Sequence, residues 1–120
     1  MPPVAKGVNL VGTWTSNHRY ALPGRPVDAS SSLVITRQNG NAIWANDVWT
    51  QPGDKGAAPV SHRDPMRGSL SPDQTHGALA KPGACFTFRV MDADHLAFAF
   101  TCIGIEGDPA VFFGVFTRKG

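Results

Sequence analysis

Apolar side chains recur at every second position along most of the chain, and Gly, Pro or Asn-Gly interrupts this alternation at short intervals. A period of two is typical of β-strands with one buried face, whereas an amphipathic helix repeats its apolar positions every three to four residues. The pattern therefore predicts an all-β chain. The candidate strands span residues 9–21, 31–38, 42–50, 59–63, 66–71, 75–80, 84–91, 95–103 and 110–118. We prefer a count of eight strands, because segment 59–63 is weak.

Tight turns between these segments indicate that neighbouring strands run antiparallel. Asn39-Gly40 supplies the left-handed residues of a tight hairpin, and Ser71-Pro72-Asp73-Gln74 has Pro at the second position of a type I turn. Met91–Asp94 and Glu106–Pro109 are expected to close the last two hairpins. Such a meander exposes two strand edges unless the first and last strands pair. We therefore predict a single domain over 1–120, an eight-stranded antiparallel up-and-down β-barrel.

The hairpin closed by Met91–Asp94 has two conceivable registers. One opposes Phe86 to Phe100 and gathers the phenylalanines of both strands on one face. The other sets Cys85 opposite Cys102, which suits a cross-strand disulfide but scatters the phenylalanines over both faces. We prefer the first register and leave the disulfide open.

The loop around Gly40 decides which side chains of the third strand face inwards. A three-residue loop with Gly40 in the left-handed position places Asp47 and Trp49 inside and Trp44 outside, whereas a two-residue turn would reverse the third strand relative to the second. We adopt the first, with these side chains inside: Leu33, Ile35, Ile43, Ala45, Asp47 and Trp49. An inward Asp47 near an indole would have a raised pKa and could transfer a proton; the alternative is an Asp at a solvated mouth.

Both ends of the chain carry a recognisable pattern, Gly12-Thr13-Trp14-Thr15 near the start and Gly114–Arg118 near the end. This pattern resembles the ends of calycin barrels, the group that contains lipocalins and avidins. In that group the late Arg packs across the Trp and closes one end of the barrel, so the resemblance implies the same for Arg118 and Trp14, as cation–π packing would favour. The likeness is closest to avidins, but Ser16–Tyr20 departs from the polar residues with which avidins hold biotin. The resemblance therefore implies a fold and not a ligand.

A row of polar side chains follows Trp14 in the first strand. If Trp14 faces inwards, alternation puts Ser16, His18 and Tyr20 on the same inner face; alternatively the strand leaves the barrel by residue 18 and the last two lie on a rim. Small-ligand sites are mostly apolar with a few convergent polar groups. We expect a cavity for a small, partly apolar or aromatic ligand, with these ligand-binding candidates: Ser16, His18, Tyr20, Asp47, Trp49, Phe86, Phe88, Phe98, Phe100 and Phe116.

Two other functions stay open. The barrel could be an enzyme of the cyclase or isomerase type in which His18 or Asp47 moves a proton, although the sequence has no recognised catalytic motif. It could instead be an interaction module that uses outward aromatic side chains such as Trp44 or Phe113, and such side chains favour a homodimer or homotetramer. A loop expected over 51–65 would either gate the mouth of the barrel or be a plain connection.

Charge and composition narrow the classes further. The chain has 11 Lys and Arg against 9 Asp and Glu, a net charge of +2, which is too small for a nucleic-acid-binding surface. The four histidines lack the spacing of metal ligands, so we expect neither a metal nor a cofactor. No apolar stretch is long enough for a signal peptide or a membrane span, which predicts a cytoplasmic protein without a membrane partner.

Overall fold

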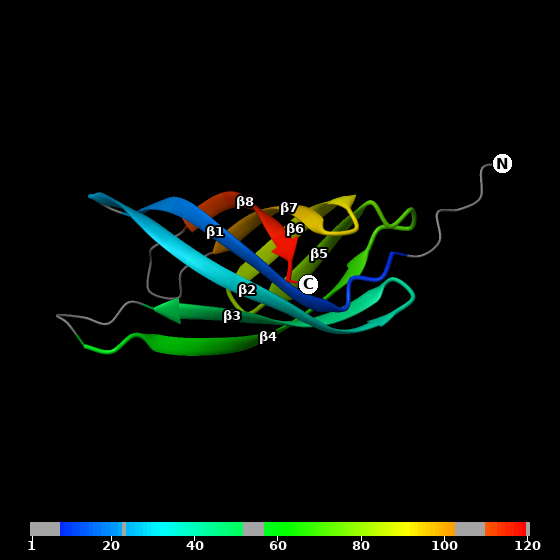
Figure 1. Cartoon of the computed structure of the whole chain (residues 1–120), viewed down its shortest axis with the longest axis horizontal. Helices are drawn as coiled ribbons and strands as arrows, with labels where there is room; N and C mark the ends of the chain where they lie inside the picture. The colour runs from blue at the N-terminus through cyan, green and yellow to red at the C-terminus, as the bar shows by residue number, and fades with distance from the viewer. Residues whose placement is uncertain (1–7, 23, 52–56, 103–109, 120) are drawn as a thin grey trace.

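Eight antiparallel strands close into a barrel in the computed structural model, which describes residues 8–22, 24–51, 57–102 and 110–119. Each strand pairs with the next one along the chain, and the last pairs with the first (Figure 1). The predicted eight-stranded meander is therefore confirmed. The strands are β1 (Gly12–Leu22), β2 (Arg25–Asn39), β3 (Ala42–Gln51), β4 (Val60–Leu70), β5 (His76–Lys81), β6 (Ala84–Asp92), β7 (His95–Cys102) and β8 (Ala110–Arg118).

The strand count of eight holds because two expected segments, 59–63 and 66–71, are one continuous strand, β4. The loop expected over 51–65 is wrong for its second half, since residues 60–65 pair with β3. Its polar sequence looked like a loop, but the inward side chains of this half-strand, His62 and Asp64, are themselves polar. β2 also begins earlier than expected, because its polar first half pairs along the whole of β1.

The preferred register of the β6–β7 hairpin is confirmed. Phe86 lies opposite Phe100, and the phenylalanines of both strands share the inner face. Cys85 lies opposite Thr101 and is a free thiol, so the alternative register with a disulfide is wrong.

The inward-facing residues of β2 and β3 are the expected ones, but the loop between the two strands is not the expected loop. Its loop has two residues rather than three, since Asn39 pairs with Ala42, and Gly40 has the left-handed φ of +59° that this first loop position requires. A β-bulge after Ile35 then shifts the register of β2 by one residue. The bulge cancels the reversal that a two-residue loop would cause, and Asp47 stays inside.

The turn between β4 and β5 has the expected geometry, with the amide of Gln74 bonded to the carbonyl of Ser71 at 2.8 Å. At the next expected turn, strand structure extends to Asp92, and the turn itself is Ala93-Asp94. The expected turn at Glu106–Pro109 lies outside the described residues.

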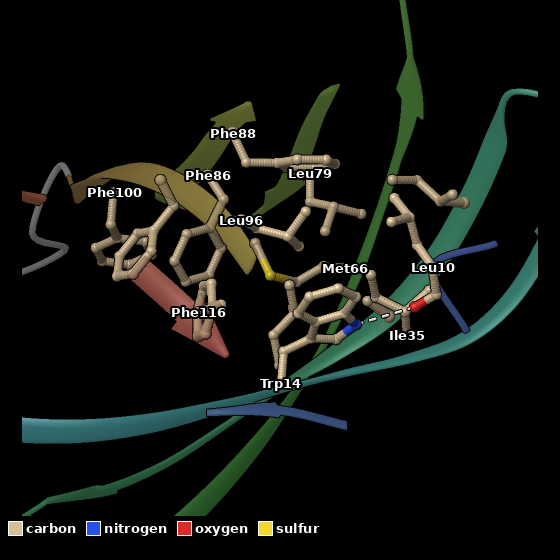
Figure 2. Packing of buried hydrophobic residues seen from close by; sticks show 14 of the residues in the cluster. Leu10, Trp14, Ile35, Met66, Leu79, Phe86, Phe88, Leu96, Phe100 and Phe116 are labelled. Atoms are coloured by element: carbon tan, nitrogen blue, oxygen red, sulfur yellow. Dashed lines mark hydrogen bonds between the residues drawn. The ribbon is translucent and has the colours of Figure 1, made fainter. Parts of the chain in front are cut away.

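A core of apolar side chains fills the end of the barrel around Trp14 (Figure 2). Trp14 is completely buried and donates a hydrogen bond from Nε1 to the carbonyl oxygen of Leu10 at 2.9 Å. The guanidinium of Arg118 covers the indole, with Cζ 4.3 Å from the ring centroid, and donates to two carbonyls just before β1. The core comprises Leu10, Trp14, Leu33, Ile35, Ile43, Ala45, Met66, Leu70, Leu79, Phe86, Phe88, Leu96, Phe98, Phe100 and Phe116.

None of the described residues belongs to a helix that is both long and apolar enough to span a membrane.

Candidate functional site

The inner wall changes from apolar to polar along the barrel axis. On β3 the inward side chains run from Ile43 through Ala45 to Asp47 and Trp49, away from the Gly40 turn. In a meander, alternate turns lie at opposite ends of the barrel, so the β1–β2 and β5–β6 turns lie at the end opposite the Gly40 turn. In Figure 1 the end with the β1–β2 turn is at the left. We call this end the polar end. Its inner wall is formed by the inward residues that lie farther from the Gly40 turn than Trp14 does, such as Asp47 and Trp49.

Three charged side chains meet inside the polar end. Lys81 Nζ lies 2.8 Å from Asp47 Oδ2 and 2.7 Å from Asp64 Oδ2. Asp47 and Asp64 are direct partners on adjacent strands, so their carboxylates share one face, and Lys81 comes from the end of β5. Like charges opposite each other destabilise a sheet, and the ammonium between them offsets this repulsion. We call these three residues the charged cluster.

The exposure of the three side chains in the charged cluster increases from Asp47 to Asp64. The Asp47 side chain is 6% exposed, Lys81 11% and Asp64 37%. Burial raises the pKa of Asp47, although its bond to Lys81 opposes this, whereas the bonds from Lys81 and then Trp49 lower the pKa of Asp64. Desolvation opposes the charged form of Lys81, but both carboxylates together raise the pKa of its ammonium. The cluster thus holds a charged ammonium that is itself largely buried.

Aromatic rings surround the charged cluster. The indole of Trp49 donates from Nε1 to Asp64 Oδ2 at 2.8 Å, and the His62 ring stacks on it at 4.1 Å between centroids. Lys81 Nζ lies 5.6 Å from the Trp49 ring centroid and 5.8 Å from that of Phe100, within the range of cation–π attraction.

A row of rings leads from the charged cluster across the barrel to β1. The Phe100 ring lies 4.7 Å from that of Phe112, and Phe112 in turn stacks on His18 at 4.1 Å with 4° between the planes. Burial lowers the pKa of His18, so the neutral imidazole is favoured at this position. We call Phe100, Phe112 and His18 the ring row.

Two serines lie beside the ring row on the inner wall. Ser16 is 6% exposed and is the direct partner of Ser31 on β2. Ser31 Oγ is buried and makes no hydrogen bond within the described residues. Buried hydroxyls normally have a partner, so the partner of Ser31 Oγ lies beyond the described residues.

The remaining predicted ligand-binding residues lie deeper or outside the described part. Four phenylalanines are buried core residues, and three of them pack ring to ring, with Phe98 and Phe116 stacked at 4.2 Å and Phe86 5.6 Å from Phe98 between ring centroids. The core rings contact the ring row, because the ring centroids of Phe86 and Phe100 are 4.5 Å apart. The backbone of Tyr20 belongs to β1, but its side chain lies outside the described residues. The core phenylalanines are Phe86, Phe88, Phe98 and Phe116.

Sequence reasoning missed several residues of this site. Lys81 follows the inward Leu79 by two positions, but the expected strand, 75–80, ended one residue before it. His62 and Asp64 were assigned to a loop. The other two missed residues are Ser31 and Phe112. Counting back in steps of two from the inward Leu33 and the inward Phe116 would have identified them.

Among the described strand pairs, β1 and β8 have the shortest pairing ladder, and it lies next to this site. Within the described residues, β1 and β8 pair only at Trp14↔Arg118 and Thr15↔Thr117. A shallow cleft of about 500 Å³ lies there, lined by hydroxyl-bearing side chains of β1, β2 and β8 that include Ser16 and Ser31.

Comparisons with known proteins define the class as a small closed β-barrel. No protein-family model matches the sequence, and no curated protein matches it either. The structure is similar to a de novo designed fluorescence-activating β-barrel, with a TM-score of 0.57, 18% identity, and coverage of 92% of this chain and 94% of that one. It is also similar to the crystal structure of Rv2717c from M. tuberculosis, with a TM-score of 0.53, 12% identity, and coverage of 92% and 93%. At these identities the likenesses concern the fold alone.

Proposed function

We propose that the protein binds a small, flat, partly apolar molecule at the polar end of the barrel. The charged cluster beside the ring row carries this proposal. Burying charges costs folding free energy, and well-packed apolar residues would often be more stable in their place. Ionisable groups with shifted pKa values next to apolar surface are common at binding and catalytic sites. Ligand binding accounts for this costly arrangement.

Two further observations support a binding barrel. The contact between Arg118 and Trp14 is the one that the calycin resemblance implies, and it leaves the opposite end of the barrel for a ligand. One structurally similar protein is described as a fluorescence-activating barrel, which supports a binding role by analogy. The proposal takes the chain as one calycin-like domain that works in the cytoplasm.

The first test is native mass spectrometry of the purified protein, followed by denaturation to identify any retained molecule. The second is titration with a neutral flat dye, Nile red, monitored by fluorescence. Phe112 and Phe113 are adjacent on β8 but face opposite sides of the wall, so they form a matched pair. Phe112→Leu should weaken dye binding about tenfold, and Phe113→Leu should leave it unchanged. A protein that retains no molecule and binds no dye would contradict the proposal.

A proton-transfer enzyme is the second candidate function. Burial raises the pKa of Asp47 and lowers that of His18, and groups whose pKa is shifted by burial are common at catalytic sites. Such an enzyme would convert the retained molecule, and His18→Ala would abolish turnover while the molecule still bound. A simple binder would release the molecule unchanged.

Self-association through the outer face of β8 is also proposed. Phe113 is 73% exposed, and Val111 and Val115 on either side share its face. Their outward neighbours on β7 carry no charge, being Ala97, Ala99 and Thr101. An uncharged apolar strip is complementary to itself, so a second copy of the chain is the partner that fits it.

A further inference from the structure

We propose that the ligand of the polar end is a flat aromatic cation. This inference rests on the proposed function and names the ligand class for the same site. It follows from the excess charge of the cluster, from the gradient of its exposure and from the ring faces around it.

The charged cluster has one more carboxylate than it has cations. Lys81 already donates to both Asp47 and Asp64, so its charge is balanced within the cluster. Four arginines with described side chains lie on the strands of the cluster and on the two strands that flank them, and all four are exposed: Arg37, Arg63, Arg67 and Arg89. With both carboxylates ionised, an anionic ligand would meet a net negative site and be repelled.

The exposed end of the cluster is a carboxylate. Asp64 is the most exposed of the three side chains, and its Oδ2 accepts from Lys81 and Trp49. Its other oxygen, Oδ1, accepts no hydrogen bond from the described residues. A cationic group approaching from the mouth would therefore meet a charged acceptor before it reached the ammonium of Lys81.

The rings around the cluster favour a cation that is flat. The faces of aromatic rings carry partial negative charge, and Lys81 already lies near the rings of Trp49 and Phe100. His62 on Trp49 and His18 on Phe112 both show close stacking at this end of the barrel, each at 4.1 Å. A conjugated cation can stack in the same way and pair its charge with Asp64, which a compact alkyl ammonium cannot.

The test compares two aromatic dyes of opposite charge, thioflavin T as the flat cation and anilinonaphthalene sulfonate as the anion, at low ionic strength. We expect thioflavin T to bind at least about tenfold more tightly. Asp64→Asn should weaken thioflavin T by about tenfold without weakening the anion, and Asp64→Glu should restore it. Asp28→Asn is the matched control, because Asp28 is an exposed carboxylate paired with Arg19 on the outside. Thermal melts establish that each variant is folded.

Three results would overturn the inference. If the anion binds more tightly than the cation, or Asp64→Asn leaves thioflavin T affinity unchanged, the charge argument fails while ligand binding stands. If Nile red binds and thioflavin T does not, the same conclusion follows. If Nile red, thioflavin T and anilinonaphthalene sulfonate all fail to bind, both the proposed function and this inference are wrong.

Discussion

At the scale of single residues, the ammonium of Lys81 determines whether two opposed carboxylates can share the inner face. The register of β3 and β4 sets Asp47 opposite Asp64, and no other cation is within hydrogen-bonding distance of either carboxylate in the described structure. Removing one partner of a buried ionic group leaves the others uncompensated, which costs much more than the pair itself contributes.

Lys81→Met should therefore destabilise the protein by roughly 3 kcal/mol at neutral pH, at the low end for buried pairs because Asp64 is partly exposed to screening solvent. Without the ammonium, burial holds the folded-state pKa of Asp47 still further above its unfolded value, and the pKa of Asp64 rises because, of the two hydrogen bonds that lower it, only the Trp49 bond is left. The folded state then binds more protons, so the loss shrinks as pH falls towards about 4. Urea denaturation at several pH values measures this, with Lys119→Met as the exposed control. A loss independent of pH would contradict the electrostatic cause.

Asp73 provides a second prediction at this scale. Hydrogen bonds from Ser71, and then Thr75, lower the pKa of this exposed carboxyl to about 2. Its contribution to stability is thus complete above the ordinary carboxyl pKa and is lost as pH falls towards about 2. An NMR titration of the Asp73 carboxyl carbon should give this value. In Ser71→Ala it should move back up, and an unmoved value would show that this bond is not the cause.

At the scale of strands and turns, alternation predicted faces better than boundaries. The inner faces of β2 and β3 were correct although the loop length was not, because burial of Leu33 and Ile35 selects the register and the bulge absorbs the difference. Strand ends were missed where the inner wall is polar, as at Lys81 and Asp64. Apolar periodicity carries no signal there, so the sequence predicted the barrel but less than half of the charged cluster.

Close packing of β5 against β6 gives an element-scale prediction. Gly77 lies opposite Phe88, and a Cβ added at Gly77 would lie 2.3 Å from Cζ of that ring. Gly77→Ala should displace the ring from its place in the core and cost about 1–3 kcal/mol. Ala80→Ser, at an exposed position of the same strand, should cost less than about 0.5 kcal/mol. Chemical denaturation measures both, and equal stability of Gly77→Ala and wild type would mean that the ring moves freely.

At the scale of the whole molecule, some aromatic side chains on the outer face of the barrel are covered and others are exposed. Arg37 covers the outward Trp44, with Cζ 4.5 Å from the ring centroid, whereas Phe113 is the most exposed of the large hydrophobic side chains in the described structure. An interaction surface is therefore better placed on β8 than on β3.

Wild-type protein should sediment as a dimer or larger assembly at high micromolar concentration, and Phe113→Ser should sediment as a monomer, because the strip on β8 loses its largest apolar side chain. Val60→Ser removes an exposed apolar side chain from β4 and should leave the assembly unchanged. Sedimentation velocity at several concentrations distinguishes these outcomes. A monomeric wild type would contradict the proposed self-association.

The short ladder between β1 and β8 has a consequence for how fast a ligand can bind. The two paired positions are Trp14↔Arg118 and Thr15↔Thr117, where the core holds both strands. Beyond them β1 and β8 are joined by the stack of His18 on Phe112, so we expect the wall to open there first while the core stays folded. A ligand too wide for the mouth then gains access through the wall. Its observed association rate levels off at the rate at which the wall parts, however much ligand is added. A narrow ligand binds through the mouth at a rate that keeps rising with its concentration, so one site has two kinetic classes of ligand.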